Sequence, residues 1–517
     1  QLKGKEFFSV VSIASIYILI RLTVLKALLA TAPSAFPTTL LQRLPSFFAS
    51  VASYIRLLFF PFDLHMEYGM VLFSWNDPKT ITGIALFFIL LICAFKKRER
   101  SPLISFSILW FFVSLLPVSN LFPINAYMAE HWLYLPSIGF FLIAAEIVHS
   151  LYTAKNLKIP AIIIIASLSG FYSFLTVRQN AYWSDPISFY ERTLKFAPYS
   201  SRVHSNLGNE FNSVGQREKA IAAYKKAIEI NPRYAKAHFN LGNVYINMGK
   251  RAEAIASYQR AVEIKSDYPT ALYNLGNAYK AMNKNKGAIA AYRKVVEINP
   301  DHANAHNNLG TVYAASNRYR EAIASYKNAI RVKPDYPEAY NNLGAVYAAM
   351  NKNKEAIASY KKAIEIDAGF ENAYINLGVI HKSMKNYDEA ITSYRKAIEI
   401  NDDHAGAYFN LGNIYANLKR TVEAVDSYKK AIERKTNFAK AYLNLGNIYK
   451  ASGNIDGALS SYKKAINIDP NYALAHNHLA AIYFQEKNYP LAITHYDKAK
   501  ELGSKNAALL EALKPYR

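Results

Sequence analysis

The sequence contains very little cysteine and has few acidic residues relative to basic ones. Its 517 residues include one cysteine, Cys93, which excludes a disulfide framework and a zinc site built on cysteines. There are 38 acidic residues against 61 basic ones, a formal net charge of +23. No glycine-rich phosphate loop, His-Glu-x-x-His pair or serine-nucleophile motif occurs. The sequence therefore gives no support for nucleotide-binding, metalloprotease or serine-hydrolase chemistry.

The chain is too long for one hydrophobic core and consists of two unlike parts. Hydrophobic residues make up 51% of it, which is too many for a disordered chain. Residues 1 to about 177 are rich in Phe, Leu and Ile, whereas the remainder is polar and repetitive. We predict an all-α protein in which a polytopic transmembrane helical region is followed by a soluble helical solenoid.

Five apolar stretches approach the roughly 20 residues that a helix needs to cross a bilayer. They cover residues 7–30, 80–95, 102–121, 133–151 and 159–177. A further stretch, residues 47–60, is shorter and carries Arg56. We expect it to be re-entrant or to lie in the membrane interface, with a sixth span as the alternative.

Short basic clusters predict the orientation, because Lys and Arg are retained on the cytoplasmic side. The clusters are Lys3 with Lys5, Lys96 to Arg100, and Lys155 with Lys158. Residues 61–79, residues 122–131 and everything after Val177 then lie on the extracytoplasmic side. We expect an integral membrane protein with repeats in the periplasm or cell envelope, or in the ER lumen if eukaryotic. The start of the sequence does not look like a signal peptide, so we expect the chain to begin partway through a longer protein.

Two extracytoplasmic connections hold ionisable residues close to membrane depth. Glu67 lies in residues 60–68, and Glu130 with His131 lies in residues 129–137. Such residues are costly near hydrocarbon, and a carboxylate beside an imidazole can exchange a proton or hold a phosphate. In the alternative interpretation they lie in the wet headgroup zone, beside Trp132 and Tyr134 as interfacial anchors.

The same segments resemble the transmembrane and tetratricopeptide repeat-containing O-mannosyltransferase family. Residues 129–137 read Ala-Glu-His-Trp-Leu-Tyr-Leu-Pro-Ser and are similar to the family's Ala-Glu-Arg-x-Leu-Tyr-Leu-Pro-Ser. Residues 60–68 are similar to its Phe-Pro-x-x-Leu-x-x-Asp-Tyr segment, and residues 178–190 to the stretch before its repeats. The resemblance implies a C-class glycosyltransferase with luminal repeats and a polyprenyl-phosphate sugar donor. It makes Glu67, Glu130 and His131 candidates for contact with the lipid phosphate or sugar.

The chain also departs from the family pattern. His131 stands where the family has Arg, and Glu67 stands where it has Asp. A histidine is a weaker and pH-dependent phosphate partner. The family's acidic catalytic motif lies in a first luminal loop that this sequence does not contain. The resemblance therefore implies only the rear part of a transferase domain.

From residue 201 the sequence repeats every 34 residues, the tetratricopeptide period. A Leu-Gly pair recurs from Leu207 to Leu445, and Leu479-Ala480 is the ninth copy. Small residues such as Gly208 and Ala220 are expected where the two helices of a repeat cross, and Tyr224 is expected to pack against the next repeat. We predict the following domains: 1–177 transmembrane region, 178–200 connector and half repeat, 201–506 nine repeats, and 507–517 a capping helix.

Histidines recur in the repeats without a convincing metal pattern. His302 and His306 have helical i, i+4 spacing, which two metal ligands could use. However, the place of His306 is taken by Leu or Tyr in other copies. It is therefore interpreted as a packing position, shared by His204, His238 and His476, and no metal is expected.

An asparagine precedes every Leu-Gly pair. We expect this row, the asparagine ladder, to face the inner groove and to bind the backbone of an extended polypeptide. It resembles the ladder in the repeats of O-linked N-acetylglucosamine transferase. In the alternative interpretation each amide satisfies a neighbouring repeat's carbonyl. The ladder comprises Asn206, Asn240, Asn274, Asn308, Asn342, Asn376, Asn410 and Asn444, and a second, incomplete row comprises Asn209, Asn243, Asn277, Asn413 and Asn447.

These observations predict a lipid-linked-sugar-dependent protein O-glycosyltransferase of O-mannosyltransferase type, whose solenoid binds the acceptor polypeptide. The alternative is a membrane-anchored scaffold without catalysis. No cofactor is evident apart from the polyprenyl-phosphate sugar donor that the resemblance implies. Expected partners are extracytoplasmic polypeptides and membrane lipid. Nucleic acid is not expected, because the lysines of the repeats alternate with Glu on an outer, solvated face.

Overall fold

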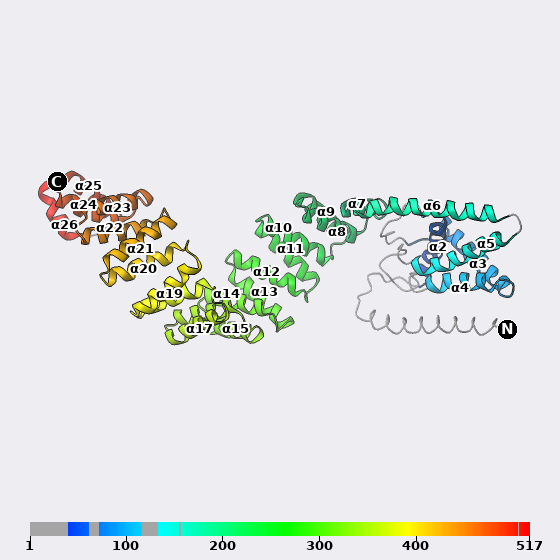
Figure 1. Cartoon of the computed structure of the whole chain (residues 1–517), viewed down its shortest axis with the longest axis horizontal. Coiled ribbons are helices and arrows are strands. Elements are labelled where there is room, and N and C mark those ends of the chain that lie inside the picture. The colour runs from blue at the N-terminus through cyan, green and yellow to red at the C-terminus, as the bar shows by residue number, and fades with distance from the viewer. Residues whose placement is uncertain (1–39, 62–71, 116–132, 155–156, 505) are drawn as a thin grey trace. The chain divides into compact units, whose positions relative to one another are not determined.

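The computed structural model describes residues 40–61, 72–115, 133–154, 157–504 and 506–517 (Figure 1). These residues form helices and turns, and no strand occurs among them. The chain divides into two compact units, Gln1–Ala271 and Leu272–Arg517. The first unit holds the apolar helices and the first repeats, and the second holds the remaining repeats. The predicted all-α fold class, apolar helices followed by a repeat solenoid, is confirmed.

Among the described residues, five apolar or partly apolar helices precede α7 (Pro186–Phe196) and the repeats. They are α2 (Leu40–Phe59), α3 (Pro78–Lys97), α4 (Pro102–Leu115), α5 (Tyr134–Thr153) and α6 (Lys158–Trp183). In the part of the chain that the structure describes, three segments are long and apolar enough to cross a membrane: Pro78–Lys97, Tyr134–Thr153 and Lys158–Arg178. They coincide with three of the five predicted spans. A fourth predicted span contains the shorter apolar helix α4, and the first, residues 7–30, lies outside the described residues.

Helix α2 is longer than the sequence suggested. The structure has one continuous helix of 20 residues where we expected a short re-entrant or interfacial segment starting at residue 47. Pro45 is accommodated inside the helix, near its start, and its carbonyl accepts a hydrogen bond from the Thr80 hydroxyl of α3 at 3.3 Å. The buried residues Phe47, Val51 and Tyr54 form a helical stripe in a core shared with α3 and α4.

Small residues let the apolar helices approach closely. A Cβ atom at Gly83 of α3 would overlap the carbonyl oxygen of Phe48 in α2. A Cβ atom at Gly139 of α5 would likewise overlap the carbonyl oxygen of Ser107 in α4. Such backbone contact is typical of membrane helices, which pack without a hydrophobic driving force between them. In each of the pairs α2–α3 and α4–α5, one glycine therefore permits the close approach of the two backbones.

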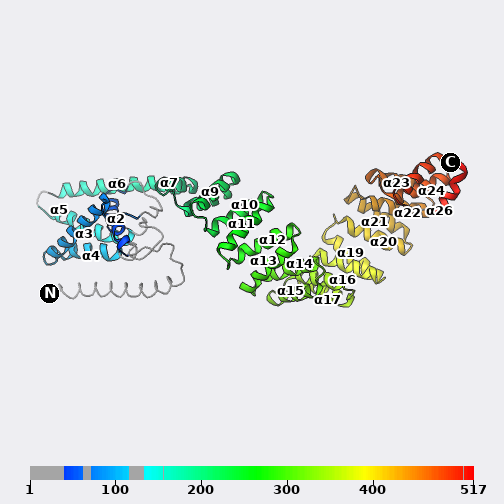
Figure 2. The same cartoon turned by 180° about the vertical axis from the view of Figure 1, so that it is seen from behind.

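The basic turns lie at one end of these helices. Successive helices run in opposite directions, so the turn from α3 to α4 and the connection from α5 to α6 share an end (Figures 1 and 2). The first connection carries Lys96 to Arg100, and Lys158 begins α6 at the second, whereas Lys155 lies outside the described residues. Helix α6 ends at the opposite end, and only Ser184 and Asp185 separate it from α7 (Pro186–Phe196).

The repeats form nine successive helix pairs in the described residues, and in each pair the first helix is called A and the second B. The A helices are α8 (Ser201–Ser213), α10 (Ala235–Asn247), α12 (Pro269–Ala281), α14 (Ala303–Ala315), α16 (Pro337–Ala349), α18 (Glu371–Ser383), α20 (Ala405–Asn417), α22 (Ala439–Ala451) and α24 (Ala473–Gln485). The B helices are α9 (Arg217–Ile230), α11 (Arg251–Ile264), α13 (Asn285–Ile298), α15 (Tyr319–Val332), α17 (Asn353–Ile366), α19 (Tyr387–Ile400), α21 (Thr421–Arg434), α23 (Ile455–Ile468) and α25 (Tyr489–Glu501).

A tyrosine ring packs on the glycine of each Leu-Gly pair. In the repeat of α16 and α17, a Cβ atom at Gly344 would lie 2.7 Å from Cε1 of Tyr360. The same holds from Gly208 with Tyr224 to Gly446 with Tyr462. The expectation that Tyr224 packs against the next repeat was therefore incomplete. The ring lies first against its own A helix, because only glycine leaves room there, and it also joins a core with Leu241 and Val244 of the next repeat.

The turn from helix A to helix B passes through a left-handed residue in every repeat. Its φ angle lies between 55° and 81°. Left-handed backbone costs glycine nothing, asparagine little and other residues about 1 kcal/mol or more. The residues are Gly215, Gly249, Asn283, Asn317, Asn351, Lys385, Lys419, Gly453 and Lys487.

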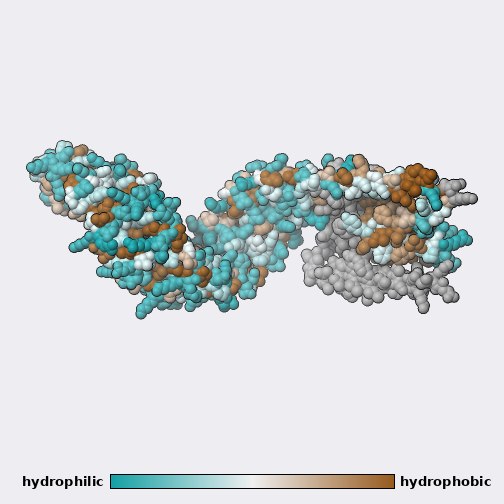
Figure 3. Space-filling model, viewed as in Figure 1, coloured by the Kyte–Doolittle hydropathy of each residue, from teal (hydrophilic) through white to brown (hydrophobic). Residues whose placement is uncertain are grey.

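A short helix follows the last repeat. Helix α26 (Ala507–Leu513) buries Leu509 and Leu513 in the core of α24 and α25, and the one-turn η3 (Lys514–Tyr516) stacks Tyr516 on Tyr489. The apolar helices and the repeats differ in surface character: brown, hydrophobic residues gather on α6 and its neighbours, whereas teal residues dominate the repeats (Figure 3). The repeats are thus built to face water and the apolar helices to face lipid.

Candidate functional site

The three catalytic candidates from the sequence lie outside the described residues. Glu67 falls in residues 62–71, and Glu130 with His131 falls in residues 116–132. Their roles remain predictions. The described structure instead contains two features on which a function can be built: a cavity among the apolar helices and a polar row along the A helices.

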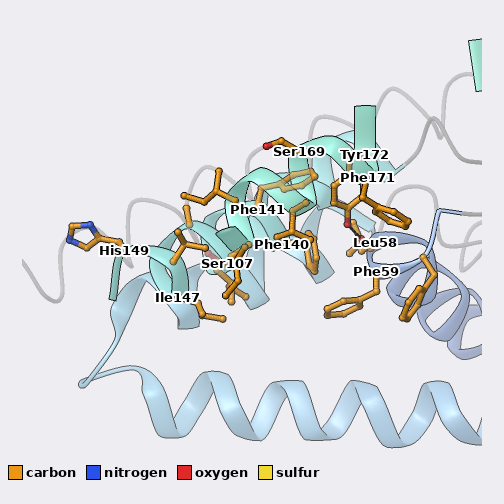
Figure 4. A pocket seen from close by; sticks show the side chains of 18 of the residues that line it. Leu58, Phe59, Ser107, Phe140, Phe141, Ile147, His149, Ser169, Phe171 and Tyr172 are labelled. Atoms are coloured by element: carbon orange, nitrogen blue, oxygen red, sulfur yellow. Dashed lines mark hydrogen bonds between the residues drawn. The ribbon is translucent and has the colours of Figure 1, made fainter. Parts of the chain in front are cut away.

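The apolar helices line a partly open cavity of about 1780 Å³. Ligand pockets of soluble proteins are typically about 300–1,000 Å³, so this one is large. Phe59, Phe140, Phe141 and Phe171 line it together with the aliphatic residues of α5 and α6 (Figure 4). The Tyr172 hydroxyl donates a hydrogen bond to the Leu58 carbonyl at 2.9 Å and so ties α6 to α2.

Few polar groups reach this cavity. Ser107, Ser169 and Ser173 line it, and His149 lies at one end (Figure 4). An apolar lining with so few hydrogen-bonding groups suits a hydrocarbon chain better than a sugar or peptide. Sequence reasoning missed the cavity, because it depends on how α2 to α6 meet and leaves no pattern along the chain.

The asparagine ladder lies on the A helices. Successive A helices lie closer together than successive B helices do. Within single units, successive A helices contact one another at α8–α10, α14–α16, α16–α18 and α20–α22. No pair of successive B helices in the described repeats contacts as extensively. Because the A helices lie closer together, they form the inner face of each unit. Each ladder side chain is half-buried there.

Most ladder amides donate a hydrogen bond to the preceding repeat. Asn240 Nδ2 donates to Asn209 Oδ1 at 2.8 Å, and Asn444 Nδ2 donates to Asn413 Oδ1 at 2.8 Å. Asn342 Nδ2 donates at 3.1 Å to the amide oxygen of Asn307. The partner is a side-chain oxygen, whereas the alternative interpretation of the sequence assumed a carbonyl. Asn308 and Asn376 make the equivalent bonds to Asn277 and Asn341.

The second asparagine row has a structural role. Asn209 Oδ1 accepts a hydrogen bond from the Tyr224 hydroxyl at 2.7 Å as well as the one from Asn240. An amide oxygen has two lone pairs, and both are used here. The tyrosine thus fixes the second-row amide, which in turn orients the ladder amide of the next repeat. The same tyrosine bond, at 2.6 to 2.9 Å, involves Asn243, Asn277, Asn413 and Asn447.

These bonds consume only part of the hydrogen-bonding capacity of the ladder. A side-chain amide has two N–H donors and an oxygen with two lone pairs. In Asn240 and Asn376 one donor is engaged by a hydrogen bond that the described residues show. The other donor and the oxygen can therefore serve a polypeptide in the groove. The ladder therefore links successive repeats and retains unused hydrogen-bonding groups.

Two lysines of the inner face also contact the ladder, and sequence reasoning missed them. Lys280 Nζ donates to Asn308 Oδ1 at 2.9 Å, and Lys382 Nζ donates to Asn410 Oδ1 at 2.8 Å. Burial lowers the pKa of both ammonium groups. Together with Lys450 they occupy one position of helix A. The recurrence of lysine at that position in three of nine repeats could have predicted this contact. It was overlooked among the more numerous lysines of the B helices.

The repeat histidines hold turns. Nε2 of His204, His238, His306 and His476 lies 2.9 to 3.1 Å from the carbonyl oxygen of the proline six residues earlier. Nδ1 of His302 accepts a hydrogen bond from the Ala305 backbone at 3.2 Å. The described residues contain no group of three or more His, Cys, Asp or Glu that could hold a metal ion.

Comparison with known proteins identifies the repeats. The TPR repeat family matches residues 208–249, 242–283, 276–316, 310–351, 380–419 and 446–486, and the Tetratricopeptide repeat family matches residues 337–370 and 405–438. The chain is 28% identical to the crystal structure of MamA (TM-score 0.32, 32% of this chain, 92% of that chain). It is 27% identical to YrrB, "a TPR protein with an unusual peptide-binding site", with a TM-score of 0.32 over 36% of this chain and 95% of that chain.

Curated relatives are named protein O-mannosyl-transferases. F38B6.6 of Caenorhabditis elegans is 29% identical over 195 residues, which are 36% of this chain and 27% of the relative. TMTC1 of Homo sapiens is 28% identical over 133 residues, which are 25% of this chain and 15% of the relative. Tmtc2 of Drosophila melanogaster is 35% identical over 107 residues, which are 20% of this chain and 11% of the relative. These matches span about a quarter of the relatives' own length or less.

Proposed function

This chain is a membrane protein with tetratricopeptide repeats that resembles the O-mannosyltransferase family, and we propose that it takes part in protein O-glycosylation from a lipid-linked sugar. Its membrane helices would hold the hydrocarbon chain of a polyprenyl-phosphate sugar donor, and its repeats would hold the acceptor polypeptide. The relatives carry transferase names, and repeats of this class bind proteins. The complete reaction is a proposal for the whole protein, because the matches cover part of each relative.

The observation that carries the proposal is the direct junction between the two parts. Two residues, Ser184 and Asp185, separate membrane helix α6 from α7, and α7 packs against the first repeat. Asp185 begins α7 by accepting a hydrogen bond from the Ser188 backbone at 3.0 Å. A polypeptide bound along the repeats is thereby tethered to the membrane that carries the donor. Such tethering raises the local concentration of acceptor at the membrane without any further contact.

The cavity among the membrane helices supports the lipid half of the proposal. Its lining of Phe59, Phe140, Phe141 and Phe171 matches a hydrocarbon ligand, and its volume exceeds that of ordinary drug-sized pockets. The basic turns at one end of the helices favour a cytoplasmic position for that end. The chain leaves α6 at the other end, so the repeats would be extracytoplasmic.

For the chemical step we assign roles to the candidates from the sequence. A hydroxyl of the acceptor attacks the anomeric carbon of the sugar, the bond from that carbon to the phosphate oxygen breaks, and polyprenyl phosphate leaves. Glu130 or Glu67 would accept the proton of the attacking hydroxyl, and His131 would contact the phosphate. These roles follow from residue chemistry and family resemblance alone.

The test uses the native protein in lipid vesicles with a radiolabelled polyprenyl-phosphate sugar and a Ser/Thr-containing peptide. We expect label on the peptide, and a loss of about a hundredfold or more in Glu130→Gln. Lys225→Ala, on an exposed B-helix position, is the matched control and should transfer normally. Peptide binding without any transfer would overturn the enzyme proposal in favour of the membrane-anchored scaffold.

A further inference from the structure

Three lysines give the inner face an unusual charge arrangement. Lys280, Lys382 and Lys450 lie at the same position of their A helices, and all are half-buried. Lys280 and Lys382 each donate one N–H to a ladder oxygen of the next repeat. Lys450 lies beside His478, which takes the ladder position in the last repeat, and burial and the Lys450 charge lower the pKa of His478.

None of these lysines has a carboxylate partner among the ion pairs of the described residues. Basic residues of the B helices are different, because many pair with a Glu three positions later. Lys362 Nζ lies 2.8 Å from Glu365, and Lys396 Nζ lies 2.6 Å from Glu399. Part of the basic charge on the outer face is therefore neutralised locally, whereas the three inner lysines have no such ion pair among the described residues.

Acidic residues on the A helices do not compensate. In the second unit they are Glu338 and Glu371, and neither pairs with any of the three lysines. Glu371 Oε2 accepts a hydrogen bond from Asn401 at 3.0 Å, and its Oε1 lies 3.7 Å from His404. Burying an ammonium group without a counter-ion is unfavourable, and the lowered pKa of Lys280 and Lys382 reflects that cost.

Each ammonium also has donors left. An ammonium has three N–H groups, and a ladder oxygen takes one of them from Lys280 and from Lys382. A ligand carboxylate on the inner face would accept the remaining donors and supply the missing negative charge. Charge-assisted bonds of this kind are about twice as strong as neutral ones.

We propose that Lys280, Lys382 and Lys450 bind acidic side chains of the polypeptide in the groove, so that the repeats prefer acceptor segments that carry Asp or Glu. The ladder amides hold the backbone without reading sequence, and the three lysines add a preference for charge. Lys280 and Lys382 are three repeats apart, and Lys382 and Lys450 are two repeats apart. The preference rests on the proposed peptide binding and extends it to a class of peptide.

The experiment measures binding of fluorescent peptides to the full chain in detergent. One peptide is a neutral Ala/Ser/Thr segment, the second has Asp at several positions, and the third has Lys there. The Asp peptide should bind most tightly and weaken as salt rises. In the triple variant Lys280→Met, Lys382→Met and Lys450→Met, we expect its affinity to fall about ten- to a hundredfold. The neutral peptide should change less than about twofold.

The control removes the same charge elsewhere. Lys294, Lys327 and Lys429 are exposed on B helices, and their change to Met should leave the preference for Asp intact. An equal loss in the control and the test variant would overturn the proposal by showing a general charge effect. Preferential binding of polyphosphate or RNA over the Asp peptide would also overturn it.

Failure of this inference can be told apart from failure of the proposed function. If the wild-type chain binds neutral and acidic peptides equally well, the charge preference is wrong and peptide binding stands. If no peptide binds, the proposed function itself fails. The thermal midpoint of each variant is measured alongside, and Lys280→Arg with Lys382→Arg, which keep the charge, should retain the preference if the triple Met variant unfolds.

Discussion

The membrane helices and the repeat helices make their closest contacts in different ways. Helices α2 and α3 meet backbone to backbone, with Gly83 against the Phe48 carbonyl. Repeat helices meet through a ring, with Tyr360 lying on Gly344. A ring can shift by a few tenths of an ångström when an atom is added opposite it, whereas a helix backbone cannot shift without moving the whole helix. Adding a side-chain atom at a helix contact should therefore destabilise the membrane region more than the repeats.

The largest effect is expected at Gly83. Gly83→Ala places a Cβ atom in the volume of the Phe48 carbonyl, so α2 and α3 must separate along a contact that includes Phe47 and Phe87. We expect a loss of about 3 kcal/mol or more. Thermal unfolding in detergent measures it. Gly170→Ala in α6 is the control, because no atom lies within 4 Å of its Cβ position. Equal stability of the two variants would contradict the close contact.

The second effect concerns peptide affinity. Replacing Asn274, Asn308, Asn342 and Asn376 by Ala should weaken peptide binding by a factor of tens, since each bond contributes about 0.5 to 1.5 kcal/mol. The thermal midpoint should also fall, because Asn308, Asn342 and Asn376 donate to the preceding repeat.

The control for the ladder breaks the same links from the other side. Asn307→Ala with Asn341→Ala removes the oxygens that accept from Asn342 and Asn376 but keeps the ladder amides. This variant should lose stability and keep most of its peptide affinity. If the ladder variant bound peptide normally, the row would be a link between repeats only.

The third effect tests the tolerance of the repeats. Gly344→Ala places a Cβ atom 2.7 Å from the Tyr360 ring, and we expect a loss of about 1 to 2 kcal/mol. The last repeat provides a natural comparison, since Ala480 already stands opposite Tyr496 there. Ala480→Gly should cost less than about 1 kcal/mol, as a glycine in a helix does. A larger loss at Gly344 than at Gly83 would reverse the comparison between the two regions.

The fourth effect is a loss of stability in acid that is specific to the repeats. Burial lowers the pKa of His238, His306 and His478 below 6.5 in the folded chain. The unfolded chain then binds more protons, so this stability is complete above about pH 6.5 and is lost as pH falls through the folded pKa values. We expect the repeat midpoint to drop by several degrees between pH 7 and pH 5. His478→Asn, which restores the ladder residue, should drop less, and an equal drop would contradict the role of His478.

The sequence predicted the repeats far better than the membrane region. A 34-residue period placed helices A and B, the Leu-Gly pair and the ladder, because each feature recurs in register. It did not reveal that Asn209 accepts from both Tyr224 and Asn240, since that depends on side-chain geometry across two repeats. Lys280 escaped notice because six other repeats lack lysine at its position.

In the membrane region, apolar runs predicted helices and little else. Helix α2 was expected to be shorter because its apolar run covers only residues 47–60 and carries Arg56, yet the helix already begins at Leu40 and packs against α3 and α4. The cavity bounded by Phe140 and Tyr172 depends on how five helices, α2 to α6, meet, and no single segment encodes it. Repeats can be compared with their own copies, whereas each membrane helix has no copy in the chain.

The smallest effect uses this advantage of the repeats. Lys419 adopts φ 57° in the turn between α20 and α21, where other repeats have Gly at φ 73° or 81°. Lys419→Gly removes the left-handed strain but adds freedom to the unfolded chain, so we expect a gain of about 0.5 to 1 kcal/mol. Asn351→Gly should gain less, because asparagine tolerates this conformation. Lys435→Gly, at φ −140°, should be neutral or destabilising. Chemical denaturation of the three variants decides it: if Lys419→Gly is no more stable than Lys435→Gly, the left-handed turn carries no strain and comparison between copies has failed at this position.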